Sequence, residues 1–279
     1  MTEQNIIKEN SNSSINKFNP SVLGTETNDK KKNINRIYGR NEILDGEYKL
    51  YQQLLAELIA SSIFVYGVCG SCLYMANNET NLMLSCAFIG GINIYIFGRI
   101  SGAHFNPAVS LALFIRKKLT FKKFVFYVIT QFIGGFIGCI VIALCRCGKF
   151  DEMAANQISN YLIQVNGGKR KAWCYISAFI SEIVGTFILI LFVLASCEKD
   201  NYLGAVQGIG VSITLISLSV LGANISSFSL NPIRSLPPAL VQVMAGGDNT
   251  PIKQIWIYIA GPFLGSALAA FIWPVFIYQ

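Results

Sequence analysis

Two Asn-Pro pairs occupy equivalent places in the two halves of this chain. They begin at Asn106 and Asn231, and each follows by 49 residues a glutamate near the start of an apolar run. These glutamates are Glu57 and Glu182. A repeated acid, a repeated Asn-Pro pair and a long apolar context are typical of membrane proteins built from two internal repeats. The pattern therefore predicts a pore with two equivalent half-sites.

The composition agrees with a membrane protein. Of the 279 residues, 53% are hydrophobic and only 13% are charged, a combination that is rare in a soluble enzyme of this length. A helix needs about 20 residues to cross a hydrocarbon core of roughly 30 Å. Suitable apolar runs lie at 52–76, 82–98, 124–145, 173–196, 203–222 and 255–277. We therefore expect an all-α fold with six transmembrane helices.

Two shorter apolar stretches, 106–115 and 231–242, open at the Asn-Pro pairs. They are too short to span a bilayer, so they predict half-helices that re-enter it. Asn is a preferred N-cap and Pro is favoured at the first helical position, which makes each pair a helix start signal. Three spans and one half-helix per repeat predict an inverted repeat, because an odd number of spans makes the second half enter from the opposite side.

The same pattern predicts the chemistry of the pore. If the two half-helices meet end to end, their positive dipole ends and the amides of Asn106 and Asn231 face one point. Cations are repelled there. A water molecule gives its oxygen to both amides, which interrupts the hydrogen-bonded chain along which a proton would move. Neutral solutes remain able to pass.

The first 45 residues differ from the rest, since they are rich in Asn, Ser and Lys and contain no apolar run. They predict a disordered tail, residues 1–45, ahead of a channel domain, residues 46–279, with repeats at about 50–145 and 173–277. With the amino terminus inside, 15 of the 22 Lys and Arg residues lie on the cytoplasmic side. Both termini are therefore expected in the cytoplasm, with acidic lipids rather than nucleic acid as partners.

The eight cysteines do not predict a metal or disulfide site. Cys69, Cys72, Cys86 and Cys139 lie in apolar spans without a His-rich cluster, so we interpret them as small buried hydrophobes. Cys69 and Cys72 match a redox motif only by their spacing. We expect no metal and no other cofactor. Asn78 begins a glycosylation sequon in the first short loop, and it could carry a sugar if that loop is extracellular.

The chain resembles the aquaporins, which are members of the major intrinsic protein family. The resemblance covers about residues 50–277 and is carried by AELIASSIFVYG, ISGAHFNPAVSLAL, TQFIGGFIG, SEIVGTFILILFVLA, NPIRS and GPFLGSALAA. It implies a homotetramer with one pore per subunit, in the plasma membrane or an intracellular vesicle membrane. It also implies roles for the pore caps, which are Asn106, Pro107, Ala108, Asn231, Pro232 and Ile233.

Further roles follow from this resemblance. Glu57 and Glu182 are expected to hold backbone groups of the half-loops, although a proton relay in a coupled transporter is an alternative. His104 either offers a polar contact to the solute or ties down its loop. Two residues depart from the family pattern: Ile233 stands where Ala is usual, and Ser227 stands where Gly is often found.

The resemblance also implies an outer constriction of four residues. Counting back or forward from the Asn-Pro pairs places it at Cys86, Ser219, Phe228 and Arg234, with Phe88 in place of Cys86 if the alignment shifts by two. Phe228 is the residue that glycerol-conducting relatives tend to have at this position, whereas Ser235 is the residue that water channels have at its position. We expect water conduction. The alternatives are glycerol, urea or another small neutral solute, and a closed pore with a junctional or scaffold role.

Gating is the last expectation. The loop 197–204, with Lys199, Asp200 and Tyr202, and the basic amino-terminal tail could each cover the cytoplasmic mouth. Phosphorylation would move either segment by changing its charge. A solvated loop and a flexible tail are the alternative. An enzyme is not expected, because no nucleophile-base pair or paired catalytic carboxylates occur in the sequence.

Overall fold

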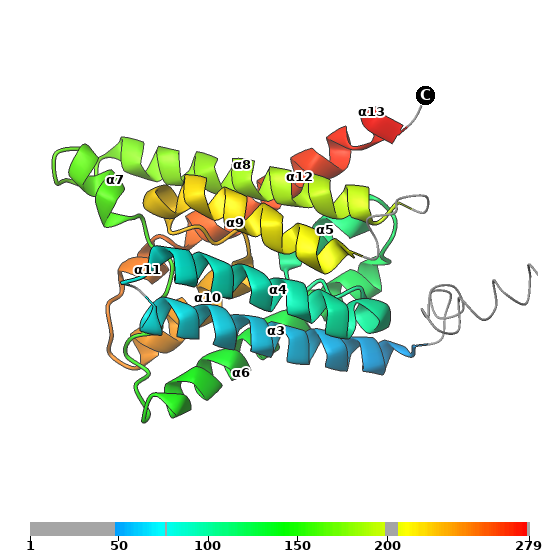
Figure 1. Ribbon diagram of the computed structural model, residues 1–279, viewed down its shortest axis with the longest axis horizontal. Coiled ribbons are helices and arrows are strands. Elements are labelled where there is room, and N and C mark those ends of the chain that lie inside the picture. Colours follow the sequence, from blue (N-terminus) through cyan, green and yellow to red (C-terminus); the bar gives the residue numbers. More distant parts are fainter. Residues whose placement is uncertain (1–47, 76, 199–205, 278–279) are drawn as a thin grey trace, which may run out of the picture. The chain divides into compact units, whose positions relative to one another are not determined.

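The computed structural model describes residues 48–75, 77–198 and 206–277, and the regular structure among these residues is helical (Figure 1). The predicted amino-terminal tail and the gate residues Lys199, Asp200 and Tyr202 lie outside the described residues. Six helices are long and apolar enough to cross a membrane, as the sequence predicted. They are α3 (Leu50–Tyr74), α4 (Glu79–Ser101), α6 (Phe121–Cys145), α8 (Ala172–Ser196), α9 (Gln207–Ser226) and α12 (Ile255–Ile272).

Two shorter helices, α5 (Pro107–Ile115) and α10 (Pro232–Met244), are the predicted half-helices. Each begins at the proline of an Asn-Pro pair. The Oδ1 atom of Asn106 accepts the backbone N–H of Ala108 at 2.8 Å, and Oδ1 of Asn231 accepts that of Ile233 at 3.1 Å. Three short helices, α7 (Asn160–Val165), α11 (Thr250–Lys253) and α13 (Pro274–Ile277), complete the described elements.

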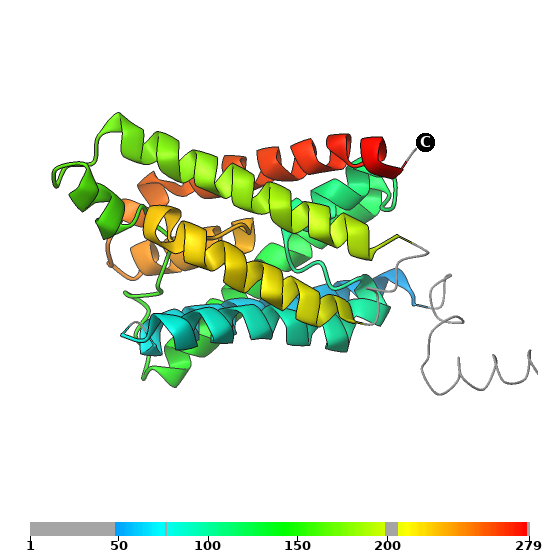
Figure 2. The same cartoon turned by 45° about the horizontal axis from the view of Figure 1, so that its top comes forward.

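The two repeats pack in the same way. In the first repeat α3 packs on α6, in the second α8 packs on α12, and α4 and α9 join the two repeats. Each half-helix crosses to the other repeat, because α5 packs on α12 and α10 packs on α6. The helices α3 and α8 run in opposite directions (Figures 1 and 2), which is the inverted arrangement that three spans per repeat predict.

Glycines make the closest helix crossings possible. A Cβ atom on Gly138 of α6 would lie 2.6 Å from the carbonyl oxygen of Ser62 in α3. In the second repeat, a Cβ on Gly261 of α12 would lie 2.7 Å from Cβ of Glu182 in α8. Small residues at such crossings let helix backbones approach closely in membranes. Glycines therefore allow close packing of α6 on α3 in the first repeat and of α12 on α8 in the second.

We name the two ends of the bundle from the course of α3. The first side is the end at which α3 begins, where α8 and α12 also end and α9 begins (Figure 2). The second side is the end at which α3 finishes. Residues around the Asn-Pro pairs lie between the two sides, at the contact between α5 and α10.

Candidate functional site

The side chains of the two capping asparagines reach across to the opposite half-loop. Nδ2 of Asn106 donates to the carbonyl oxygen of Leu230 at 3.0 Å, and Nδ2 of Asn231 donates to that of Phe105 at 2.9 Å. A carboxamide has one acceptor oxygen and two N–H donors. The oxygen caps the helix and one N–H binds the opposite loop, so each amide retains one N–H. Both asparagines line an internal cavity, and that remaining donor is available to its contents.

The half-loops have an unusual backbone. Phe105 has φ 31° and Leu230 has φ 54°, in the left-handed region that side chains with a Cβ rarely adopt. Such conformations cost free energy and persist only where the surroundings impose them. In both loops the residue two positions earlier, Ala103 and Phe228, is left-handed as well. The two loops therefore need an anchor.

Glu57 is the anchor of the first half-loop. Its Oε1 accepts the hydroxyl of Ser101 at 2.6 Å and the backbone N–H of His104 at 2.9 Å. Its Oε2 accepts the backbone N–H of Phe105 and the side-chain amide of Gln131, both at 2.8 Å. Four donors thus surround a fully buried carboxylate. Hydrogen bonds of this kind offset the cost of burying the charge.

Glu182 anchors the second half-loop with three donors. Its Oε1 accepts the hydroxyl of Ser226 at 2.7 Å and the backbone N–H of Ser229 at 2.9 Å. Its Oε2 accepts the backbone N–H of Leu230 at 2.8 Å. Among the described residues, the anchor of the first half has one more donor, the side-chain amide of Gln131. The contacts fit the scaffold role that the family resemblance implies for both glutamates.

Sequence reasoning missed the serines and the glutamine of these anchors. Ser101 and Ser226 each lie 44 residues after the glutamate they bind, so the repeat spacing contained the signal. A second pair repeats in the same way. Nδ1 of His104 lies 3.0 Å from Oγ of Ser110, and Oγ of Ser229 lies 2.6 Å from Oγ of Ser235.

His104 has contacts that fit both of the roles that the sequence left open. Its backbone binds Glu57, its ring binds Ser110, and the same residue lines the internal cavity. Ser227 occupies the position where the family often has Gly. It has φ 56° and ends α9, just as Gly102 with φ 91° ends α4. The left-handed backbone explains why glycine suits this position.

The cavity leads from the first side to the asparagines. Its walls are mostly apolar, and the lining residues include Val109, Leu113, Leu189, Val193, Val211 and Leu215. The cavity ends at the polar groups of His104, Asn106 and Asn231. The cavity has a volume of about 60 Å³, and one water molecule needs roughly 10–15 Å³. A short file of water molecules therefore fits between the mouth and the two asparagines.

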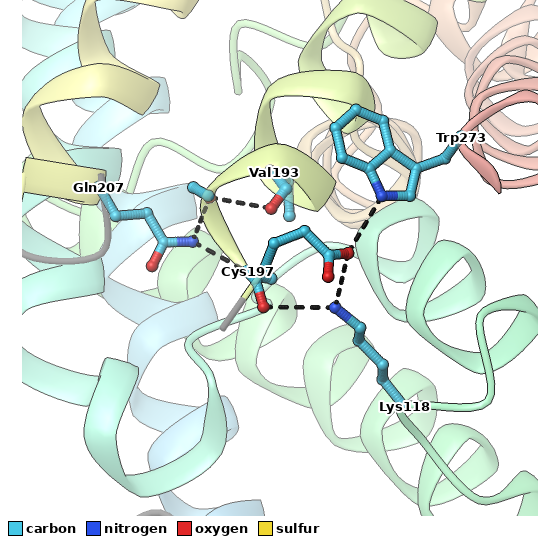
Figure 3. Close-up of polar contacts among 7 residues, drawn as sticks. Lys118, Val193, Cys197, Gln207 and Trp273 are labelled. Atoms are coloured by element: carbon cyan, nitrogen blue, oxygen red, sulfur yellow. Dashed lines mark hydrogen bonds and ion pairs between the residues drawn. The ribbon is translucent and has the colours of Figure 1, made fainter. Parts of the chain in front are cut away.

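Polar contacts hold the elements around the cavity mouth (Figure 3). Glu198, just after α8, forms an ion pair with Lys118 at 3.1 Å and accepts Nε1–H of Trp273 at 3.1 Å. Lys118 also donates to the carbonyl of Cys197 at 3.3 Å, and Cys197 and Gln207 line the cavity. Burial raises the pKa of Glu198, but the hydrogen bonds from Trp273 and Lys118 outweigh it and hold the pKa below its ordinary value.

Arg234 lies on the second side of the asparagines, in the first turn of α10, and is 5% exposed. Its Nη1 donates to the carbonyl of Ala154 at 2.9 Å, and its Nη2 lies 3.4 Å from Sγ of Cys72. Nη1 is also 4.0 Å from Sγ of Cys69. Cys86 packs, like Cys72, against the apolar cluster that contains Cys69. The structure therefore groups Cys86 with the two cysteines that contact the arginine.

The remaining residues expected at the constriction lie as follows. The ring of Phe228 packs into space left by Gly222 and Gly185, so it lies between α8 and α9. Ser219 is partly exposed on α9. Phe88 is 48% exposed and lines an apolar surface groove between α4 and α9, away from the arginine. Of the two candidates on α4, Cys86 is the one near Arg234.

The cap residues after each asparagine are buried. Pro107, Ala108, Pro232 and Ile233 are all buried, and Ala108 and Ile233 are fully so. Ile233 belongs to the apolar cluster that includes Phe105. It is a packing residue beside the loop.

The structure also describes the remaining sequence features. All eight cysteines are free thiols, and no group of three or more His, Cys, Asp or Glu in the described ranges has a metal-binding arrangement. Sequence reasoning treated Cys69 and Cys72 as packing residues and missed their contact with Arg234. Asn78 is exposed at the start of α4, where its Oδ1 accepts the backbone N–H of Asn81 at 3.1 Å.

Comparisons with known proteins agree with this architecture. The family model "Major intrinsic protein" matches residues 46–273. Aquaporin TIP2-3 of Arabidopsis thaliana is 32% identical over 78% of this chain and 84% of its own length. Glycerol uptake facilitator protein-like 6 of Lactiplantibacillus plantarum is 28% identical over 79% of this chain and 95% of its own length.

A solved structure shares the fold. The aquaglyceroporin from Plasmodium falciparum superimposes with a TM-score of 0.69 at 18% identity, covering 82% of this chain and 98% of that one. This likeness concerns the arrangement of the helices. Together with the family model, which spans most of the chain, it leads to one conclusion. The chain belongs to the major intrinsic protein family, whose members are membrane channels and not enzymes.

Proposed function

We propose that this channel conducts water passively and excludes ions and protons. The reciprocal contacts of Asn106 and Asn231 carry the proposal. They point the starts of two half-helices at one place and leave one N–H on each amide. Helix starts carry partial positive charge, so a cation at this point is repelled. A water molecule there accepts both donors through its oxygen and cannot also donate along the file.

The narrow surroundings support water as the solute. The cavity on the first side has room for a short file of water molecules and mostly apolar walls. On the other side of the asparagines, Arg234 adds a positive charge, and contacts with Ala154 and Cys72 hold its guanidinium. An arginine in such a position repels cations and donates hydrogen bonds to a neutral solute. These features favour the smallest neutral solutes.

A channel for glycerol or a similar solute is the second candidate. Phe228 resembles the glycerol-conducting members, and two of the similar proteins are named as a glycerol uptake facilitator-like protein and an aquaglyceroporin. Glycerol carries hydroxyl groups that the guanidinium of Arg234 can bind. Direct measurement of solute permeation separates the two candidates.

We also propose that the first side faces the cytoplasm and that the subunits form a homotetramer. The exposed side chains of Lys117, Lys118 and Lys122 lie together on the first side, and positive charge is enriched on cytoplasmic loops. Exposed apolar side chains along α4 and α9 suit contact with lipid or with another subunit. Cross-linking of the purified protein in membranes tests the tetramer.

Stopped-flow swelling of proteoliposomes tests the function. Vesicles with the full-length protein are exposed to a sucrose gradient for water, and to glycerol or urea gradients for these solutes. We expect faster water flow than in empty liposomes, little glycerol or urea flow, and no proton flux into vesicles loaded with a pH-sensitive dye. Glycerol entry comparable with water flow would support the second candidate. Flow of water, glycerol and urea equal to that of empty liposomes would refute both.

One variant tests the role of the asparagines. Asn231→Asp keeps the N-cap oxygen and the size of the side chain but adds a negative charge at the meeting point. We expect it to admit cations or protons. Asn78→Asp is the matched control, because Asn78 also caps a helix but lies exposed at the membrane edge. An unchanged ion barrier in Asn231→Asp would contradict the proposed mechanism.

A further inference from the structure

Side chains of α3 and α4 meet near the second side. Oγ of Ser71 lies 2.6 Å from Oγ of Ser85, so the two helices are close together here. The next residue on each helix is a cysteine, and Cys72 and Cys86 both pack against the apolar cluster that contains Cys69. The two thiols therefore lie on neighbouring stretches of two packed helices.

The pair lies beside a fixed positive charge. Nη2 of Arg234 is 3.4 Å from Sγ of Cys72, and the guanidinium is held by the carbonyl of Ala154. A neighbouring arginine is one of the surroundings that make a cysteine a better nucleophile. Both Cys72 and Cys86 are partly exposed, whereas Cys69 is fully buried. Small reagents can thus reach the pair, which a purely packed cysteine would not allow.

We propose that Cys72 and Cys86 are a redox-sensitive thiol pair that forms a disulfide beside Arg234 and thereby lowers the permeability of the channel. The oxidant is a hydroperoxide, of which hydrogen peroxide is the simplest. It is a neutral molecule not much larger than water, so its access through the lumen rests on the proposed function. With the first side in the cytoplasm, the pair lies toward the compartment in which disulfides persist.

The reaction is balanced with hydrogen peroxide as the only co-reactant. The sulfur of Cys72 attacks one peroxide oxygen, the O–O bond breaks, and the thiol proton leaves with the other oxygen as water. The product is a sulfenic acid on Cys72. The sulfur of Cys86 then displaces that oxygen, which leaves as a second water with the proton of Cys86. Two thiols are oxidised to one disulfide, and one peroxide is reduced to two waters.

The disulfide acts on permeation through Arg234. Bond formation draws the sulfur of Cys72 toward Cys86, so Nη2 of Arg234 loses a neighbour at 3.4 Å. The contact of Nη1 with Ala154 remains. The freed half of the guanidinium then turns toward water in the lumen. A guanidinium that occupies the lumen obstructs the file of water.

The test uses the full-length protein in proteoliposomes, with and without hydrogen peroxide. We expect mass spectrometry under non-reducing conditions to find a peptide pair joined at Cys72 and Cys86. Water permeability should fall toward that of empty liposomes, and dithiothreitol should restore it. In Cys86→Ser, dimedone should label Cys72 as a sulfenic acid, and no disulfide should form.

Cys145 and Cys147 provide the matched control, since both are exposed thiols at the end of α6 or just after it. The double variant Cys145→Ser, Cys147→Ser should retain the peroxide effect in full. Joined peptides that involve only these two cysteines, or a Cys72–Cys86 disulfide without loss of water flow, would overturn the proposal. Peptide mapping does not require conduction, and untreated permeability is measured first. A failure of the proposed water conduction is therefore distinguishable from a failure of the thiol pair.

Discussion

Replacing Glu57 or Glu182 with Gln tests how each anchor holds its half-loop. A glutamine side chain has the shape of glutamate, but one carboxylate oxygen becomes an NH₂ group that cannot accept a hydrogen bond. In both anchors each carboxylate oxygen accepts the backbone N–H of one half-loop residue. The serine hydroxyls, by contrast, can rotate and accept from the new NH₂. Each substitution therefore leaves one backbone N–H of a half-loop without its acceptor.

The acceptor count gives the magnitude. Hydrogen bonds to charged groups contribute about 1.5–3 kcal/mol each, so the loss of one backbone acceptor should cost about 1.5–3 kcal/mol in either variant. Gln131 donates to Glu57 and has an unpaired side-chain oxygen, which it can turn to the new NH₂. We predict that Glu57→Gln and Glu182→Gln destabilise the fold to a similar extent.

The assay compares unfolding midpoints of the detergent-solubilised variants, followed by circular dichroism, together with water permeability in proteoliposomes. Ser101→Ala and Ser226→Ala are the controls. Each removes one hydroxyl donor to a glutamate, at 2.6 Å and 2.7 Å, so their effects should be similar. A much larger loss of stability in one glutamine variant than in the other, with equal serine controls, would refute the acceptor count as the explanation.

Three further predictions concern packing and charge. Gly138→Ala should destabilise the fold by about 1–3 kcal/mol, because the new Cβ meets the backbone of α3. Gly98→Ala should leave the stability unchanged, because the nearest atom to its new Cβ is Cγ2 of Ile94 at 3.8 Å. Thermal unfolding in detergent compares the two variants. Glu198→Gln should lower stability at neutral pH but not in acid. A lowered folded pKa means that the contribution of Glu198 is present above its unfolded pKa and lost as pH falls through the folded value. A pH series of melting midpoints that stays parallel to the parent would contradict this. Ile233→Ala should cost about 2–5 kcal/mol without raising water permeability, since Ile233 is fully buried in an apolar cluster; faster swelling would show instead that it narrows the lumen.

The sequence predicted the helices well because local properties determine them. The length of each apolar run decides whether a segment can span, and the Asn-Pro pairs define where α5 and α10 begin. The family resemblance, carried in part by the motifs around Glu57 and Glu182, implied their function as loop anchors. The partners Ser101 and Ser226 escaped notice because serine is common in membrane helices and carries no signal by itself. Only their repeated spacing distinguishes them.

The sequence by itself determined an inverted pair of repeats, each with three spans and one half-helix, because chain length, apolar runs and capping residues act locally. Tertiary structure decided which groups meet. Nδ2 of Asn106 binds a carbonyl 124 residues away, and Arg234 lies beside a cysteine 162 residues away. From the sequence, Cys69 and Cys72 of α3 were interpreted as packing residues. The packing of α3 against α10 places both beside the buried guanidinium of Arg234. Such contacts depend on how helices pack, which no local propensity specifies.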